Sequence, residues 1–310
     1  MNSRRDFLQQ ATALTVGGAL FSHSSWAESF YGASKIPETG IQLFTILMQM
    51  ESDPVGSLQK LAAAGYKNIE SAFSKPGSFY GKKPKEFKSL VHDLGMEWRS
   101  HHVVGSPMKP PPNIKIPNGP DGKPMSFPKM MTLKDNSQEL VDLVAEAGIP
   151  YIVCSSIGIE TGDEIKASAA LLQTAGEQAK KAGLLFAYHN HATEFDVKDG
   201  IVAYDYFTTQ ISADILKLEL DLGWVFRAGK NPVDLFKKYK GRFPLLHVKD
   251  MDKDGNIVPF GTGSYDFKET FKNLDIAGVK YFFIEQDFPR NPFDDIVTSA
   301  NNFNKFKMSL

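Results

Sequence analysis

The chain has 310 residues, of which 42% are hydrophobic and 23% are charged, and its formal net charge is −1. This is the composition of an ordinary globular protein, and the length suits one large α/β barrel or two small domains. The balanced charge, without a basic stripe, argues against a nucleic-acid partner. The single cysteine, Cys154, excludes an internal disulfide, and its apolar neighbours predict a buried structural thiol.

The first residues have the layout of an export signal. Arg4 and Arg5 precede an uncharged stretch at 11–21, and small residues precede a cleavage point after Ala27. The apolar stretch is too short to cross a membrane, and no cysteine near the cleavage point offers a lipid attachment site. The paired arginines resemble a twin-arginine (Tat) signal. We therefore expect a signal peptide over 1–27, recognition by the Tat export machinery, a periplasmic location and no stable membrane anchor.

From residue 40 onward, predicted strands alternate with predicted helices. Short apolar runs predict strands, and amphipathic runs between a capping residue and a glycine predict helices. Asp53 and Pro54, for example, are typical of a helix start, and Gly65 is typical of its end. The expected strands lie at 41–46, 66–70, 96–101 and 151–155, and further strands begin near 184, 216, 243 and 281. The expected later helices lie at 85–94, 137–147, 163–182, 204–210, 232–239, 267–274 and 294–308.

Eight strands that alternate with helices predict a single-domain (β/α)8 TIM barrel over 40–310, after an N-terminal extension over 28–39. The alternative is a doubly wound open sheet. That fold would need a nucleotide-binding loop after the first strand, and the sequence contains no G-x-G-x-x-G. A segment rich in Pro and Gly over 104–131 follows the third strand. We expect it to form a lid or a substrate wall on the active-site face.

Ligand-type side chains stand where the last four strands should end. His189, Asp221, His247 and Glu285 each follow an apolar run. Because the carboxyl ends of barrel strands face one pocket, these donors are expected to form a divalent-metal site. The alternatives are salt bridges for the carboxylates and hydrogen-bonded core positions for the histidines. His191 has the same strand parity as His189 and is the alternative ligand at the fifth strand.

Five short motifs resemble the xylose isomerase-like barrel family. They are YHNHATEF (188–195), LDLGW (220–224), HVKD (247–250), GTGSYDF (261–267) and FIEQD (283–287). The resemblance extends over about 40–308 and implies a metal-dependent TIM barrel with one divalent ion, which can be Mn, Co, Zn or Mg. Asp221, His247 and Glu285 match the family's last three ligands. His189 stands where the isomerases and epimerases carry a glutamate, and this change favours Zn, Co or Mn over Mg.

Because His189 replaces the glutamate at the fifth strand, the sequence lacks the second glutamate that the epimerases use in proton transfer. In the epimerases that the chain resembles, two glutamates act as an acid/base pair, and here only Glu285 remains. Another base is required, and Lys249, His191 and Glu194 are the candidates. Lys249 lies two residues after His247 and therefore on the same face, where a divalent ion should lower its pKa. The alternative for Lys249 is a solvated loop position.

Other polar side chains at strand ends are expected to contact the substrate. Glu70, His101 and His102 end the second and third strands and, with Glu194, have groups that can bind sugar hydroxyls. Trp224 is expected to stack on a sugar ring, and its alternative is packing at the barrel rim.

These expectations describe a divalent-metal-dependent sugar isomerase or epimerase that acts on a small carbohydrate through an enediolate. Because the fifth-strand ligand is altered and the protein is expected to be exported, a lyase or dehydratase that eliminates from a keto-sugar or keto-glycoside is the alternative. A non-catalytic sugar-binding barrel is a further alternative. A repair enzyme like endonuclease IV would need more metal-binding histidines, and Trp224 stands where one of them would be.

Overall fold

A computed structural model describes residues 36–107 and 130–310. The expected signal peptide over 1–27, most of the expected extension and residues 108–129 of the Pro-rich segment lie outside the described residues. The predictions made for them therefore stay predictions.

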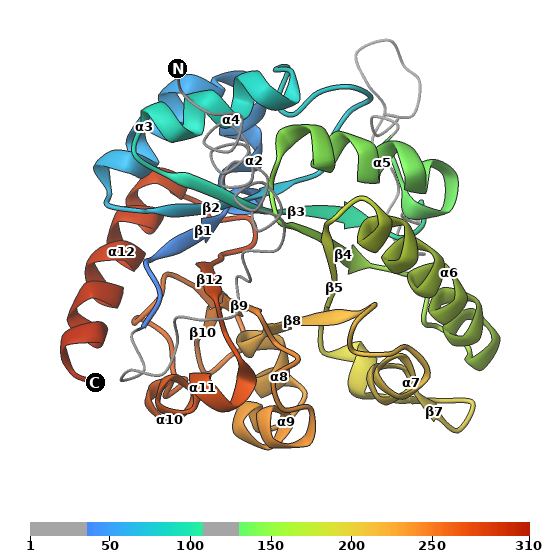
Figure 1. The fold of residues 1–310 in the computed structure, drawn as a ribbon. Helices are drawn as coiled ribbons and strands as arrows, with labels where there is room; N and C mark the ends of the chain where they lie inside the picture. Colours follow the sequence, from blue (N-terminus) through green and yellow to red (C-terminus); the bar gives the residue numbers. More distant parts are fainter. Residues whose placement is uncertain (1–35, 108–129) are drawn as a thin grey trace, which may run out of the picture. The chain divides into compact units, whose positions relative to one another are not determined.

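Eight parallel strands close into a barrel, and helices surround it (Figure 1). Each strand pairs with the barrel strands that precede and follow it in the chain, and β1 closes the ring against β12. The predicted (β/α)8 barrel is confirmed, and the doubly wound open sheet is excluded. The barrel strands are β1 (Gly40–Gln42), β2 (Asn68–Ala72), β3 (Glu97–Val104), β4 (Tyr151–Ser156), β5 (Leu185–His189), β8 (Lys217–Asp221), β9 (Leu245–Val248) and β12 (Tyr281–Ile284).

The helices begin and end at the residues that the sequence favours for these positions. The Asp53 side chain accepts a hydrogen bond from Gly56 N at 2.9 Å, and Gly148 ends α5 in the left-handed conformation. No helix in the described part of the chain is long and apolar enough to cross a bilayer. The helices are α2 (Leu47–Ser52), α3 (Pro54–Ala63), α4 (Pro84–Asp93), α5 (Leu133–Ala147), α6 (Gly162–Lys181), α7 (Ala203–Gln210), α8 (Leu222–Arg227), α9 (Pro232–Lys238), α10 (Lys268–Lys272), α11 (Leu274–Ala277) and α12 (Pro292–Met308).

Short elements decorate the loops. Two short 3-10 helices, η1 (Leu43–Ile46) and η2 (Thr193–Phe195), follow β1 and β5. Two small hairpins were not predicted from the sequence, because a strand of two residues is too short to show an alternation of apolar and polar side chains. They are β6 (Val197–Lys198) with β7 (Ile201–Val202), and β10 (Asp250–Met251) with β11 (Ile257–Val258).

The first strand is shorter than the sequence predicts. The apolar run 41–46 was expected to be one strand, but β1 ends at Gln42 and η1 follows at once. The cause is local, because the Gln42 side chain accepts a hydrogen bond from Phe44 N at 3.0 Å and starts the turn. The same side chain donates to Glu70 Oε2 on the neighbouring strand at 2.8 Å. The early turn therefore places a polar side chain at the mouth of the barrel.

The barrel interior has an apolar layer with a polar layer above it. Five buried side chains fill the apolar layer: Tyr151, Val153, Ala187, Leu245 and Phe283. Successive side chains of a strand alternate between its two faces, so a residue two positions further along the strand also points inward. His189, His247 and Glu285 stand two positions after Ala187, Leu245 and Phe283. The polar residues of the site therefore rest on a packed apolar floor.

The larger apolar core lies between the strands and the helices that cover them. Cys154 belongs to this core and is fully buried, as predicted. Burial raises the pKa of its thiol to about 12, so the side chain is a neutral packing group at neutral pH.

Candidate functional site

The four residues predicted as metal ligands lie together. His189, Asp221, His247 and Glu285 each offer a ligand atom, and these atoms all lie within 4.8 Å of one another. The strand register explains the meeting, because Asp221 on β8 pairs directly with His247 on β9. His189, rather than His191, belongs to this group, which we call the outer group.

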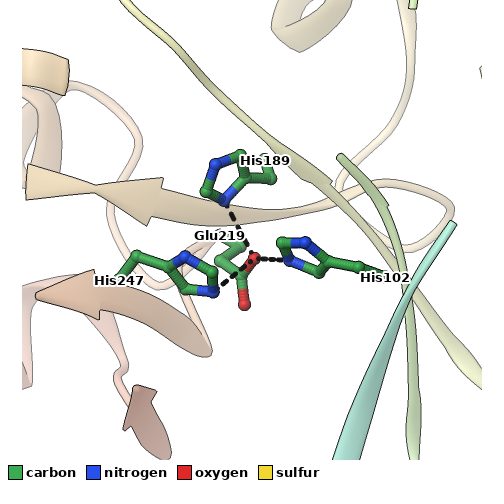
Figure 2. Close-up of side chains that lie close together, drawn as sticks. All are labelled: His102, His189, Glu219 and His247. Atoms are coloured by element: carbon green, nitrogen blue, oxygen red, sulfur yellow. Dashed lines mark hydrogen bonds and ion pairs between the residues drawn. The ribbon is translucent and has the colours of Figure 1, made fainter. Parts of the chain in front are cut away.

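A second group shares two of these residues and contains a side chain that sequence reasoning missed. His102, His189, Glu219 and His247 also offer ligand atoms within 4.8 Å of one another, and we call them the inner group. Figure 2 shows the three histidine rings directed at the Glu219 carboxylate. Glu219 Oε2 lies 2.6 Å from His102 Nε2, 3.1 Å from His189 Nδ1 and 3.2 Å from His247 Nε2.

A usable signal for Glu219 was present in the sequence. Glu219 stands two residues before Asp221 in the run LKLEL, so both carboxylates face the barrel interior. An acidic residue inside an apolar strand needs a compensating partner, and that requirement marks the position. Glu70 is equally buried and completes the inner carboxylate layer, with its Oε2 2.5 Å from His247 Nε2.

Three buried carboxylate oxygens accept no hydrogen bond from the described part of the chain: Glu70 Oε1, Glu219 Oε1 and Asp221 Oδ2. The other oxygen of Asp221 is held, because it accepts a hydrogen bond from Trp224 N at 2.9 Å at the start of α8. Asp221 Oδ2 lies 3.9 Å from His189 Nε2 and 3.2 Å from Lys249 Nζ. Buried oxygens of this kind need a cation, and mixed imidazole and carboxylate donors suit a divalent metal ion.

Burial and charge act differently on the three histidines of the inner group. Burial lowers the pKa of His102 to about 4 and holds the pKa of His189 well below its usual range. Burial also opposes protonation of His247, but Glu219, Glu285 and Glu70 outweigh it and raise the pKa of this ring. The pKa of Glu219 is raised to about 7, chiefly by burial. His102 and His189 are therefore neutral rings that can donate or accept one hydrogen bond, and His247 is the ring of the three that binds a proton most readily.

Lys249 lies inside the site, among three carboxylates. Its Nζ is 3.2 Å from Asp221 Oδ2, 2.9 Å from Glu285 Oε2 and 3.0 Å from Asp287 Oδ2. Burial works against its charge, but with no ion bound these carboxylates outweigh burial and raise the pKa of Lys249. The pKa expected from the sequence was for a lysine beside a divalent ion, and it stays a prediction. The sequence could not show that three carboxylates surround the amine. Lys249 is thus a cation in this structure and a poor proton acceptor.

The loop that follows β5 carries the most accessible imidazole of the site. The side chain of His191 is 40% exposed, and its Nδ1 lies 3.6 Å from Glu194 Oε1. Burial opposes its charged form, but Glu194 outweighs burial and raises the pKa of His191. Tyr188 donates a hydrogen bond to Glu194 Oε1 at 3.0 Å and fixes the carboxylate. A base oriented by a buried carboxylate is a common arrangement for proton transfer.

A cavity of ≈ 1560 Å³ opens above the outer group. Its polar wall includes His102, His189, Lys249 and Glu285, together with His191. Aromatic side chains also line the cavity. They are Phe44, Phe73, Trp224 and Phe288.

The predicted substrate-contact residues divide into two sets. His102 and Trp224 line the cavity, whereas Glu70, His101 and Glu194 are buried behind the cavity wall. His101 follows the opposite strand parity to His102 and points away from the barrel interior. Its ring contacts Ser71 Oγ at 2.7 Å and Ser74 Oγ at 3.2 Å. Burial lowers the pKa of His101 to about 3, so this ring is a neutral part of the packing.

Two cavity residues were given no role from the sequence, although Asp287 is the last residue of the FIEQD motif and Phe288 follows it. Asp287 contacts Lys249, and its pKa is raised to about 6, mainly by burial and by the charge of Glu285. Phe288 is 83% exposed and adopts a left-handed backbone conformation with φ 49°. A non-glycine residue with positive φ next to a cavity is a recognised sign of functional constraint.

The xylose isomerase-like TIM barrel family model matches residues 58–303. Among curated proteins, an inosose dehydratase from Lacticaseibacillus casei is 25% identical over 271 residues, covering 77% of this chain and 84% of that protein.

Solved structures have the same fold. A sugar phosphate isomerase/epimerase from Parabacteroides distasonis is similar with a TM-score of 0.70 and 23% identity, covering 86% of this chain and 98% of that one. The zinc-bound IOLI protein is similar with a TM-score of 0.64 and 14% identity, covering 88% of this chain and 98% of that one.

Proposed function

Because the chain belongs to the xylose isomerase-like TIM barrel family, we propose that it is a divalent-metal-dependent sugar isomerase or epimerase. The outer group, at the floor of the cavity and beside Lys249 and His191, is the observation that carries this proposal. The substrate is a small carbohydrate with a carbonyl group, and the central step is removal of the proton on the carbon next to that carbonyl.

The outer group His189, Asp221, His247 and Glu285 would hold the ion. A divalent ion bound there would polarise the substrate carbonyl and stabilise the negative charge of the enediolate. The aromatic rim offers apolar faces for the C–H surface of a sugar ring. The buried polar groups behind the wall keep the ligand side chains in place.

His191 is the proposed base. Its ring lines the cavity, and Glu194 behind it orients the imidazole and stabilises its charged form. Lys249 remains protonated among three carboxylates and would stabilise negative charge that develops on the substrate. Return of the proton to the neighbouring carbon gives isomerisation, and return to the opposite face of the same carbon gives epimerisation.

A lyase is the second candidate, and two observations favour it. The curated relative is an inosose dehydratase, and His189 stands where a two-glutamate epimerase would need a second carboxylate. In this reaction His191 takes the α-proton, the β-carbon–oxygen bond breaks, and the protonated His191 passes its proton to the leaving oxygen. The products are an unsaturated carbonyl compound and water, or a free alcohol from a glycoside.

One experiment tests both candidates. The metal-loaded protein is incubated in heavy water with a panel of keto-sugars, inososes and keto-glycosides, and the products are followed by NMR. An isomerase or epimerase gives a rearranged sugar with deuterium at the α-carbon, and a lyase gives an unsaturated carbonyl product. Sugar binding without exchange by a metal-loaded protein would contradict both enzymes and favour the sugar-binding barrel.

We also propose that the protein acts outside the cytoplasm. The proposal rests on the paired Arg4 and Arg5, the uncharged stretch and the small residues before the cleavage point after Ala27. Export through the Tat machinery would deliver the folded protein to the periplasm.

A further inference from the structure

The two histidines shared by the inner and outer groups each present one ring nitrogen to each group. His189 Nδ1 lies 3.1 Å from Glu219 Oε2, and its Nε2 lies 3.9 Å from Asp221 Oδ2. His247 Nε2 lies 2.5 Å from Glu70 Oε2, and its Nδ1 lies 2.9 Å from Glu285 Oε2. Both rings therefore stand between a deep carboxylate and a carboxylate nearer the cavity.

In this arrangement the tautomers of His189 and His247 decide which of the two groups can bind the ion. A neutral imidazole carries a hydrogen on one nitrogen and a lone pair on the other, and only the lone pair can bind a metal ion. An ion in the outer group would use His189 Nε2 and His247 Nδ1. An ion in the inner group would use the opposite nitrogens. The group that accepts the N–H of each ring therefore decides whether the ion binds in the outer or the inner group.

We propose that the ion binds in the outer group, and that Glu219 and Glu70 are positioning residues that fix the tautomers of its two histidine ligands. In this arrangement Glu219 accepts the Nδ1–H of His189, and Glu70 accepts the Nε2–H of His247. Histidine ligands commonly donate their second N–H to a carboxylate, which orients the ring and strengthens it as a ligand. The inference rests on the proposed function, because it assumes that the site binds a metal ion.

Three features support the outer position. His189 Nδ1 lies at hydrogen-bond distance from Glu219, and His247 lies closer to Glu70 on its Nε2 side, at 2.5 Å, than to Glu285 on its Nδ1 side, at 2.9 Å. The 3.9 Å between His189 Nε2 and Asp221 Oδ2 is too long for a hydrogen bond, but it suits two ligands on either side of one ion, given metal–ligand bonds of about 2 Å. His189 and Glu285 line the cavity, whereas Glu70 and Glu219 are fully buried. The carboxylate that lines the cavity therefore belongs to the outer group, whereas the inner group reaches the cavity through histidine rings alone.

His102 completes the arrangement by holding Glu219. Its Nε2 lies 2.6 Å from Glu219 Oε2, and its ring stacks on His247 with centroids 5.0 Å apart and an interplanar angle of 8° (Figure 2). The Glu219 oxygen thus faces three imidazole nitrogens, of which His102 Nε2 is the nearest. His102 Nε2 also lies 3.2 Å from Glu70 Oε2, so His102 acts on the ion through both deep carboxylates.

The competing arrangement places the ion in the inner group, where Glu70 Oε1 and Glu219 Oε1 accept no hydrogen bond from the described residues. Crystals of the wild-type protein loaded with Zn²⁺ distinguish the two by anomalous diffraction at the zinc edge. We expect one ion in contact with Asp221 and Glu285. An ion in contact with Glu219 and His102 would overturn the inference and leave the proposed function standing, whereas a protein that takes up no ion would overturn both.

Metal affinity tests the positioning role without an activity assay. Competition with a chromophoric chelator should show Zn²⁺ binding about 10–100-fold weaker in Glu219→Gln and in Glu70→Gln, because each loses a carboxylate that orients a ligand. Glu219 contacts both ligand rings and Glu70 contacts His247, so a variant that fails to fold leaves the other as a test. Glu177→Gln, an exposed position on α6 with the same chemical change, is the control and should bind as the wild type does. Unchanged affinity in a folded Glu219→Gln or Glu70→Gln protein would overturn the positioning role.

The absorption spectrum of the Co²⁺-loaded protein adds a signature that a merely structural residue would not change. We expect the visible bands to persist in Glu219→Gln with altered position or intensity, since the ligands remain but one is reoriented. In Asp221→Asn a ligand is exchanged, and we expect the bands to be lost or replaced. Bands that disappear in Glu219→Gln and persist unchanged in Asp221→Asn would assign the ion to the inner group.

Discussion

His191 Nδ1 lies 3.6 Å from the carboxylate oxygen Oε1 of Glu194, and the ring projects from the loop after β5 into the cavity. The carboxylate is buried and accepts a hydrogen bond from Tyr188 at 3.0 Å, so it holds a negative charge in a fixed place beside the ring. His189 and His247 are ligand candidates whose rings contact Glu219 and Glu70. His191 lines the cavity and does not belong to the outer group, so its ring is available to accept a proton from a substrate.

Replacing His191 by Gln should therefore remove the base without removing the ion. We expect kcat to fall about 10²–10⁴-fold, the usual contribution of a positioned base, while the metal content stays at the wild-type level. Steady-state kinetics and elemental analysis on the same preparation check this. His92→Gln changes an exposed histidine on α4 and should leave kcat unchanged. A wild-type kcat in His191→Gln would remove this residue from the mechanism.

Removal of the ion should destabilise the fold as well as abolish activity. The outer group brings Asp221 and Glu285 together in a buried position beside Lys249, and a divalent ion would compensate their charges further. At a metal concentration of 100 times Kd, binding should add about 2.7 kcal/mol to the free energy of unfolding. Thermal unfolding with and without a chelator measures the effect. In Asp221→Ala the chelator should cause no shift, and an equal shift there would place the ion elsewhere.

Phe288 should contribute to substrate binding rather than to stability. Its ring is 83% exposed and contacts Phe44 edge-on at 5.2 Å between centroids, at the rim of the cavity. Phe288→Ala should raise KM by about twofold to tenfold, the equivalent of about 0.5–1.5 kcal/mol for an aromatic contact, with little change in kcat or Tm. Met308→Ala removes a side chain that is 82% exposed near the end of α12 and serves as the control. Equal KM values for the two variants would contradict a binding role.

The contact between α7 and α9 predicts a pH-dependent part of the stability. Asp205 Oδ1 accepts hydrogen bonds from Lys238 Nζ at 2.8 Å and from Tyr239 OH at 2.5 Å. Burial opposes the charge of Asp205, but these partners outweigh burial and lower its pKa. A carboxylate with a lowered pKa stabilises the folded state above its unfolded pKa, and this contribution is lost as the pH falls through the folded pKa.

Asp205→Asn should accordingly lower the Tm at neutral pH and have a smaller effect at acidic pH. The cost at pH 7 should be below about 1 kcal/mol, because the pair is partly exposed to solvent. Thermal unfolding of both proteins across pH 3 to 7 tests the sign. A difference that grows as the pH falls would contradict the assignment.

The export proposal is tested by replacing both Arg4 and Arg5 with Lys. We expect the variant to accumulate in the cytoplasm at precursor length, since the Tat receptor reads the paired arginines. Cell fractionation and mass spectrometry of the N-terminus check the location and the cleavage after Ala27. A chain that begins at residue 28 should also remain in the cytoplasm, and a periplasmic double-Lys variant would exclude this route.

The sequence by itself determined the barrel and most of the outer group. Helices that end at glycine and lead directly into apolar strands establish the alternation, and strand ends in a barrel all face the same way. For that reason His189, Asp221, His247 and Glu285 could be assigned to one site without coordinates. The short first strand was missed, because its end depends on one hydrogen bond from Phe44 N to the Gln42 side chain.

The tertiary structure alone decided how the site works. Strand parity shows that a residue faces the interior, but not its height in the barrel or the partners it meets from other strands. Glu219 and Glu70 come from separate strands and meet His189 and His247 only because the strands are staggered as the barrel closes. The charge of Lys249 likewise depends on three carboxylates from two strands and the loop beyond one of them. Local patterns encode which residue types are present, whereas the electrostatics of a buried site depend on distances that only the closed barrel sets.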